Sequence, residues 1–406
     1  MFFYNLKTNK NKFVKTTLID TLFYFVVYIY ISFISPYLNS LGWSEFLKGW
    51  FFSIFAITGI LTAPIIGTIS DKIGRFHLMI IGFSTEIIAL IGYIVFSNTL
   101  ILFLLRVLSA IAFNLVVITA FSRVNDTMTN DNRSKKTGLF HSLLSVSGMI
   151  APLLGGIVAD AFGYKAVFML ALITALIFLT SILIHDKLFF KEYSPHRKKE
   201  QVKLRDGNPL LDIKDVLRFK PLRQISILGL ATTVTTPFTI MVLPYIIIER
   251  MNLSNTHLSI ALFFMGAVHI SQFLLGILAD KIGKRKSMII GLSIFSISFL
   301  MMFFAPNYNI LLLLILFEAL GGSLWNISAW AFMSDIGEAK GIEGKVIGSY
   351  SSIIKITQAI SFVITGTILS AWKEGIFIFF GLVIIIPLFL IGRRWYFEDK
   401  KISYSN

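Results

Sequence analysis

Residues 67–75 read Gly-Thr-Ile-Ser-Asp-Lys-Ile-Gly-Arg, and residues 276–284 read Gly-Ile-Leu-Ala-Asp-Lys-Ile-Gly-Lys. The two stretches are 209 residues apart, and each follows a long hydrophobic run. The same offset separates Asp126 from Asp335. A repeated charged loop between apolar segments is typical of secondary transporters built from two related halves, whose binding site lies between those halves.

The hydrophobic runs on both sides of these loops predict the fold class. Of the 406 residues, 55% are hydrophobic and only 15% are charged, whereas soluble domains have about 25% charged residues. A transmembrane helix needs about 20 mostly apolar residues, and continuous runs of that length exclude barrel strands. We therefore expect an all-α integral membrane protein with twelve transmembrane helices, at residues 16–38, 49–70, 78–97, 99–122, 137–159, 166–184, 224–248, 257–279, 287–304, 310–333, 346–370 and 375–392.

The distribution of basic residues predicts the orientation. If both termini lie in the cytoplasm, 31 of the 37 Lys and Arg residues fall on the cytoplasmic side, four on the opposite side and two inside spans. This asymmetry is a strong positive-inside signal. It also accounts for the net charge of +15 through contacts with anionic lipid headgroups rather than nucleic acid.

The only long connection divides the chain into two pseudo-symmetric bundles. We predict an N-terminal six-helix bundle at residues 1–184, a cytoplasmic linker at 185–223 and a C-terminal six-helix bundle at 224–406. The linker carries 11 basic and 6 acidic residues. Its end, residues 210–219, places apolar side chains among charges and predicts a short amphipathic helix on the membrane surface.

Several function classes are disfavoured by what the sequence lacks. It has no Cys, so disulfides and thiol chemistry are excluded. It has no nucleophile elbow, phosphate-binding loop or cluster of metal ligands. We therefore expect no enzyme activity, no cofactor and no metal. A sensor built on a transporter scaffold is a further alternative, but the chain shows no added soluble domain to support it.

The motifs quoted so far resemble the major facilitator superfamily, and the resemblance covers essentially the whole chain. The doubled G-x-x-x-D-[KR]-x-G-[KR] loop is that superfamily's most specific signature. Within it, the chain resembles the 12-helix drug:proton antiporters, because the fifth span carries a variant of the antiporter motif G-x-x-x-G-P-x-x-G-G. The matching residues are Ser147, Ala151, Pro152, Gly155 and Gly156. Small residues at these positions also favour plain helix packing, and the two interpretations are compatible.

The resemblance implies a role for the repeated loops in gating. Asp71 would meet the start of the eleventh span, where a carboxylate can cap a helix N-terminus, and Arg75 would pair with Asp126. These contacts would hold the two halves together on the cytoplasmic side. The complete predicted gating set is Gly67, Asp71, Lys72, Gly74, Arg75, Asp126, Gly276, Asp280, Gly283 and Asp335.

Ionisable residues inside spans indicate function, because each is costly unless it is paired or hydrated. Asp20 in the first span and Glu318 in the tenth are the predicted proton-coupling residues. Depth along the helices places Glu318 and Lys355 near the bilayer centre, where they could pair. Glu86 lies on a span that the resemblance makes peripheral, so we interpret it as structural. The predicted substrate-cavity residues are Tyr24, Tyr28, Arg106, Asn114, His269, Gln272, Trp325, Lys355 and Gln358.

Two transport functions remain open on this sequence. The first is proton-coupled efflux, by alternating access, of small amphipathic compounds. The second is a proton-coupled symporter that takes up a sugar, an organic acid or another metabolite. The expected partners are a small-molecule substrate, protons and the lipid bilayer, without nucleic acid. We expect a monomer in the plasma membrane with both termini in the cytoplasm.

Overall fold

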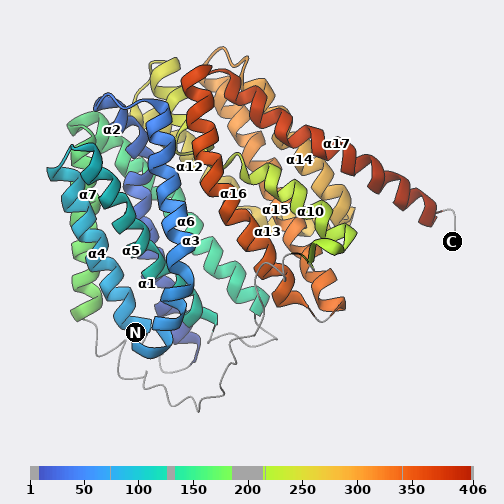
Figure 1. Cartoon of the computed structure of the whole chain (residues 1–406), viewed down its shortest axis with the longest axis horizontal. Helices are drawn as coiled ribbons and strands as arrows, with labels where there is room; N and C mark the ends of the chain where they lie inside the picture. Colours follow the sequence, from blue (N-terminus) through green and yellow to red (C-terminus); the bar gives the residue numbers. More distant parts are fainter. Residues whose placement is uncertain are drawn as a thin grey trace. The chain divides into compact units, whose positions relative to one another are not determined.

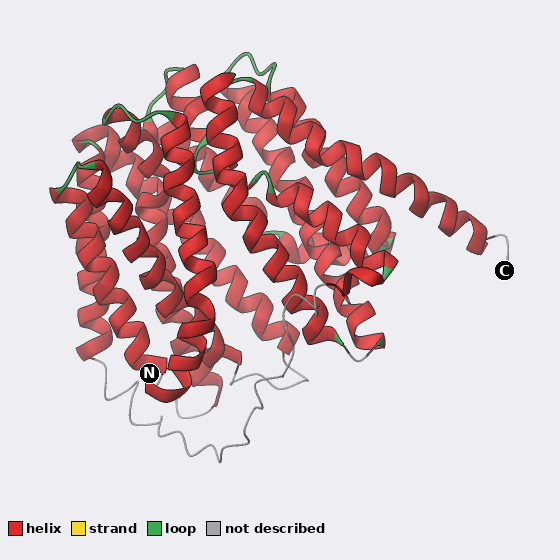
Figure 2. Ribbon diagram, viewed as in Figure 1, coloured by secondary structure: helices red, strands yellow, loops and turns green. Residues whose placement is uncertain are grey.

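The computed structural model describes residues 9–73, 75–125, 133–184, 214, 216–340 and 342–403, and every regular element among them is a helix (Figures 1 and 2). Ten helices are long and apolar enough to cross a membrane, and two further spans each consist of two helices joined across a short break. These twelve segments coincide with the twelve predicted spans. The expectation of an all-α, multi-pass membrane protein is confirmed.

The described helices divide into two compact units. In the first unit, α1 packs against α5, α6 and α7, and α4 packs between α5 and α7. The first span also contains a short 3₁₀ turn, η1, followed by α2. The helices of the first six spans are α1 (Asn9–Tyr30), η1 (Ile31–Phe33), α2 (Ile34–Ser40), α3 (Glu45–Ile73), α4 (Arg75–Val95), α5 (Thr99–Asn125), α6 (Arg133–Phe162) and α7 (Tyr164–Ile184).

The second unit contains most of the remaining spans. Its α14 packs closely on α15 and on α17, and α10 packs on α16 and α17. Its helices are α10 (Lys220–Thr233), η3 (Thr236–Phe238), α13 (Gln272–Ile282), α14 (Lys284–Met302), α15 (Tyr308–Ala339), α16 (Glu343–Ala371) and α17 (Gly375–Ser403). Gly283 joins α13 to α14 with a φ of 90°, a left-handed conformation that favours glycine.

One segment after the linker belongs to the first unit by its contacts. Residues Thr239–Ala267 cluster with the first six spans rather than with the second unit. They contain α11 (Val242–Pro244), the π-helical turn η4 (Tyr245–Arg250) and most of α12 (Asn255–Ile270). We call this segment the span 7–8 hairpin. The division of the sequence at residues 185–223 stays a prediction, because residues 185–213 and 215 lie outside the described residues. Within the predicted amphipathic helix at 210–219, residues 214 and 216–218 are helical.

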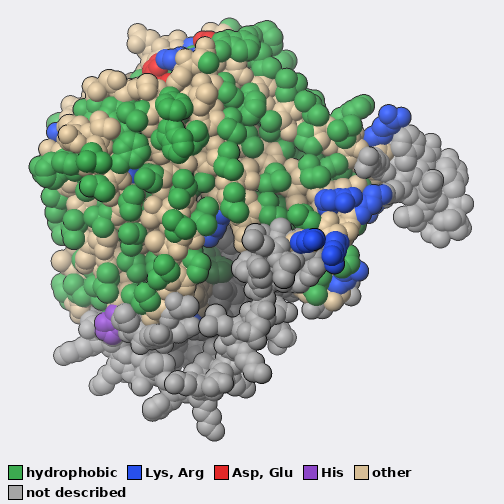
Figure 3. All heavy atoms as spheres, in the orientation of Figure 1, with side chains coloured by type: hydrophobic (Ala, Val, Ile, Leu, Met, Phe, Trp, Pro, Cys, Tyr) green, Lys and Arg blue, Asp and Glu red, His purple; other side chains and the backbone are tan. Residues whose placement is uncertain are grey.

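The surface is that of a protein solvated by lipid. Hydrophobic side chains cover most of the face seen in Figure 3, and large apolar residues such as Leu61, Leu100 and Phe389 are each more than 60% exposed. Monomeric soluble proteins rarely expose so much apolar surface to water. The buried residues are also mostly apolar, so the few buried ionisable side chains are unusual.

Candidate functional site

Asp20 lies on α1 and is completely buried. In the part of the chain that the structure describes, neither of its carboxylate oxygens has a hydrogen-bond partner. An ionised carboxylate in this position would lack both water and a counter-charge, which is costly. The conformation described here therefore suits a protonated Asp20, and loss of the proton requires a rearrangement that brings water or a cation to it.

Tyr24 and Tyr28 follow Asp20 at intervals of one helical turn, as the sequence predicts. Their rings lie 5.7 Å apart, and the ring of Tyr24 contacts Phe113 edge-on at 5.4 Å. Together with Asp20 they form an aromatic face of α1 that carries a carboxyl group. Such a surface suits an amphipathic guest, because tyrosine combines a flat apolar ring with a polar tip.

Arg106 is enclosed by aromatic rings rather than lying open to a cavity. Its guanidinium carbon lies 4.2 Å from the ring centre of Phe55 and just over 5 Å from those of Phe51 and Phe52. Its Nε and Nη1 atoms have no hydrogen-bond partner among the described residues. Cation–π contacts of this kind hold a buried guanidinium in place. Arg106 is therefore fixed in the first unit, with donors still unused.

Glu86 is a second buried ionisable residue in the neighbourhood of Arg106. It is buried on α4, close enough to Arg106 for their charges to interact. The hydroxyl of Tyr30 donates a hydrogen bond of 2.5 Å to its Oε1 atom. Burial and the hydrogen bond from Tyr30 are compatible with the structural role predicted for Glu86, which stays a prediction.

We expect Glu86→Gln to destabilise the protein by about 3 kcal/mol, because it leaves the buried guanidinium of Arg106 without a counter-charge. The double variant Glu86→Gln with Arg106→Met removes both charges and fills the aromatic cage with an apolar side chain. We expect it to recover most of the lost stability. Thermal unfolding in detergent measures both effects, and a double variant that is less stable than the single one would contradict the pairing.

Asn114 is engaged in helix packing within the first unit. Its Nδ2 atom donates to the backbone oxygen of Gly59 at 2.7 Å and to Oγ1 of Thr62 at 2.8 Å. These contacts join α5 to α3. Asn114 was predicted as a cavity residue, and its amide hydrogens are used here to hold two helices together.

Glu318 lies buried on α15, and its Oε2 atom has no hydrogen-bond partner among the described residues. Lys355 lies on α16 with an exposed side chain. The structure shows no ion pair between these two residues, so it does not bring them together in this conformation. Glu318 thus resembles Asp20: each is a buried acid with at least one carboxylate oxygen that lacks a hydrogen-bond partner, one in each unit.

A second polar cluster lies beside the break in the eighth span. Nδ1 of His269 lies 3.0 Å from Oγ of Ser323, and Nε2 of Gln272 lies 3.3 Å from the same nitrogen. Ser323 is on α15, one and a half turns after Glu318. Trp325 is buried on the same helix, and Gln358 is half-buried on α16. The structure therefore brings His269 and Gln272 together, through a serine that sequence reasoning missed.

The second copy of the repeated loop forms the contact predicted for the first. Nζ of Lys284 lies 2.5 Å from Oδ2 of Asp335, and these residues are the repeat equivalents of Arg75 and Asp126. In the first copy, Gly74 and Asp126 lie outside the described residues, as do the side chains of Asp71 and Lys72. Asp280 of the second copy is exposed, and Gly276 is half-buried on α13.

The small residues of the fifth span pack tightly inside the first unit. A Cβ atom on Gly155 would lie 2.1 Å from the backbone oxygen of Ile29, and one on Gly156 would lie 1.7 Å from Oγ of Ser259. Ser147 donates to the backbone oxygen of Thr21 at 2.9 Å, and Ala151 is fully buried. These contacts favour helix packing as the reason for the pattern, since small residues allow close approach in lipid.

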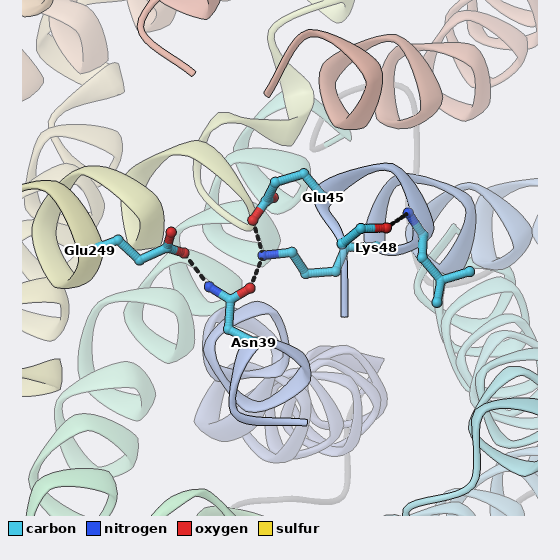
Figure 4. A network of polar contacts seen from close by, with 6 residues as sticks. Asn39, Glu45, Lys48 and Glu249 are labelled. Carbon is cyan, nitrogen blue, oxygen red and sulfur yellow. Dashed lines mark hydrogen bonds and ion pairs between the residues drawn. The ribbon is translucent and has the colours of Figure 1, made fainter. Parts of the chain in front are cut away.

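Sequence reasoning also missed a group of polar residues at the span ends of the first unit. Asp160 ends α6 and binds the start of α12, and Asn39 links Lys48 to Glu249 (Figure 4). The triplet Ser254-Asn255-Thr256 was an available signal, because such residues favour a helix start. Its carboxylate partner lies 95 residues earlier in the chain and could not be identified from local pattern.

Ten to twelve candidate membrane spans among the described residues, an internal repeat and buried acids are together typical of a membrane transporter. Comparison with known families agrees: the sequence profile described as Major Facilitator Superfamily matches residues 17–268 and 238–405. The chain belongs to the major facilitator superfamily, a family of transporters rather than enzymes.

Similar proteins narrow the comparison further. The chain is 23% identical over 357 residues to the class H tetracycline resistance protein of Pasteurella multocida, covering 86% of each protein. It is 27% identical over 286 residues to the multi-drug resistance efflux pump PmrA homolog of Lactococcus lactis, covering 68% of each. Among solved structures, the D-xylose-proton symporter matches with a TM-score of 0.74 at 16% identity, over 93% of this chain and 96% of that one. This last likeness shows the fold alone.

Proposed function

We propose that this transporter exports small amphipathic compounds in exchange for protons by alternating access. The observation that carries the proposal is that two acids are buried in the described structure, Asp20 with neither carboxylate oxygen hydrogen-bonded and Glu318 with its Oε2 atom lacking a partner. A proton-coupled carrier needs acids that change protonation state when the surroundings open to water, because a buried charge without a partner is costly. Similarity to proteins named for tetracycline and multidrug resistance supports the export direction.

The substrate surface that we propose is the aromatic face of α1. Tyr24 and Tyr28 would contact the apolar body of the guest, and Asp20 would carry the proton. Within the second unit, the cluster of His269, Gln272 and Ser323 is a separate candidate for polar contacts to a guest. The buried acids favour cationic or neutral guests over anionic ones, because a carboxylate that has lost its proton attracts a cation and repels an anion.

Symport of a metabolite is the second candidate. The observation that favours it is the imperfect antiporter motif, in which Ser147 and Ala151 replace two glycines. In either mode we propose that the protein is a monomer in the plasma membrane with both termini in the cytoplasm, as the distribution of basic residues indicates. We also propose that Asp71, Arg75 and Asp126 latch the cytoplasmic side, by analogy with the Lys284–Asp335 contact.

The function can be tested in proteoliposomes under an imposed pH gradient. We expect the parent protein to accumulate a fluorescent cationic amphiphile on the acidic side and Glu318→Gln to accumulate none, because an amide cannot carry the proton. Glu338→Gln is the control, since it makes the same change at an exposed carboxylate near the end of the same helix, and we expect it to retain gradient-driven transport. Accumulation by Glu318→Gln at the parent rate would contradict the role of Glu318.

A further inference from the structure

The loop that joins η4 to α12 is held at both of its ends by the first six spans. On the α12 side, the carboxylate of Asp160 caps the helix: Oδ1 accepts from the backbone and side-chain nitrogens of Asn255 at 2.8 and 2.9 Å, and Oδ2 accepts from the backbone nitrogen and the hydroxyl of Thr256 at 2.8 and 2.5 Å. The first backbone N–H groups of a helix have no partner within the helix. The positive end of the helix dipole also favours a carboxylate there.

On the η4 side, Glu249 is held by Asn39 (Figure 4). The orientation of the Asn39 amide group is fixed by Lys48, which is buried and paired with Glu45. A lysine ammonium can only donate hydrogen bonds, so the Nζ atom of Lys48 donates to the side-chain oxygen of Asn39, at 2.5 Å. The amide nitrogen is left to donate to Glu249, and an ionised carboxylate has only acceptors. The buried ion pair therefore orients Asn39 toward the hairpin.

Between these two polar contacts the hairpin packs tightly against α6. Gly156 of α6 faces Asn255 and Ser259 of α12, and a Cβ atom on Gly156 would lie 2.7 Å from the backbone oxygen of Asn255. Ser259 is completely buried. The polar contacts thus lie at the edge of a tightly packed seam between α6 and the hairpin.

We propose that Asp160 and Asn39 form a two-point polar clamp that holds the span 7–8 hairpin closed against the first six spans, and that the transport cycle releases it. Under the orientation given by the basic residues, the clamp lies on the side opposite the termini. The helices are broken directly before the hairpin, after Phe238, and shortly beyond its end, at Ser271. Bending at these breaks would let the hairpin part from α6 while its helices stay intact. Asp160 and Glu249 are exposed, so water can replace their contacts when the clamp opens. The inference rests on the proposed function only in assuming alternating access.

The absence of native Cys allows a direct test with Ser259→Cys as the reporter and a membrane-impermeant thiol reagent. The buried reporter reacts only when the hairpin leaves α6. We expect Asp160→Ala to raise the labelling rate on the order of tenfold, the usual effect of losing a helix cap. Asp160→Asn keeps an acceptor oxygen and should have a smaller effect.

Asn39→Asp tests the second point with almost no change of shape. It replaces the donor that faces Glu249 with a like charge, so we expect a similar rise in labelling. Adding Glu249→Gln restores a donor and an acceptor across the contact, and we expect it to return the rate toward that of the parent. Ser296→Cys, buried on α14 of the second unit, is the control reporter and should label equally slowly in every variant.

The clamp is overturned if Asp160→Ala and Asn39→Asp label at the parent rate. It is equally overturned if Glu249→Gln fails to lower the labelling rate of Asn39→Asp. It is also overturned if the labelling rate of the Ser296→Cys control rises together with that of the reporter, because the variants would then loosen the whole protein rather than the clamp. The assay needs no substrate and no pH gradient. Failure of the clamp is therefore distinguishable from failure of proton-coupled export.

Discussion

Replacing Asp20 with Asn is expected to abolish proton-coupled transport while the protein still folds and inserts into the membrane. The side chain is completely buried and both of its oxygens lack partners in the described structure. An amide of nearly the same shape adds no buried charge, so the fold should tolerate it. It cannot release a proton, so the step that depends on exchange at this position is lost.

The transport rate in proteoliposomes and the thermal unfolding temperature in detergent together measure this effect. Asp20→Glu is the matched control, because it keeps a carboxyl group on the same helix face, and we expect it to retain part of the activity. A full transport rate in Asp20→Asn, with unchanged dependence on the pH gradient, would exclude Asp20 as a coupling residue.

The second large effect is expected at Gly155, where Val should destabilise the protein by about 3 kcal/mol. A Cβ atom there would lie 2.1 Å from the backbone oxygen of Ile29 and 2.5 Å from the ring of Phe33. The ring can turn, but the backbone oxygen moves only if α1 moves. Since α1 packs on α5, α6 and α7, its displacement would disturb much of the first unit.

Gly148 provides a control two turns earlier on the same face of α6. A Cβ atom there would lie 3.5 Å from the ring of Tyr28, which is an ordinary contact distance, so Gly148→Ala should leave thermal stability nearly unchanged. Equal stability of Gly155→Val and the parent would contradict the close packing of α1 against α6.

The spans were predictable from sequence, but the breaks within them were not. Hydropathy averages over a window and depends on composition, so it finds the span at 224–248 whether or not the helix is continuous. The interruption between η3 and α11 depends on which backbone groups find partners in neighbouring helices. The grouping of Thr239–Ala267 with the first unit likewise depends on contacts with residues far away in the chain.

The sequence indicated which candidate residues share a helix face, but not which side chains of different helices lie together. Counting residues along a helix gives the depth of Glu318 and Lys355 in the membrane but not the directions in which they point. A pair of equal depth can therefore face different surroundings, as these residues do. The link between Arg106 and Glu86 could not be predicted for the same reason. Asp20, Tyr24 and Tyr28 were easier to predict, because residues one turn apart on one helix share a face.

The central claim, exchange of substrate for protons, is tested most directly by the direction of proton flow. Proteoliposomes containing a pH-sensitive dye would be given an outward gradient of a transported amphiphile with no initial pH difference. The account predicts that protons enter as the substrate leaves, and that Asp20→Asn and Glu318→Gln prevent this movement. Protons leaving together with the substrate would show symport and contradict the exchange mechanism.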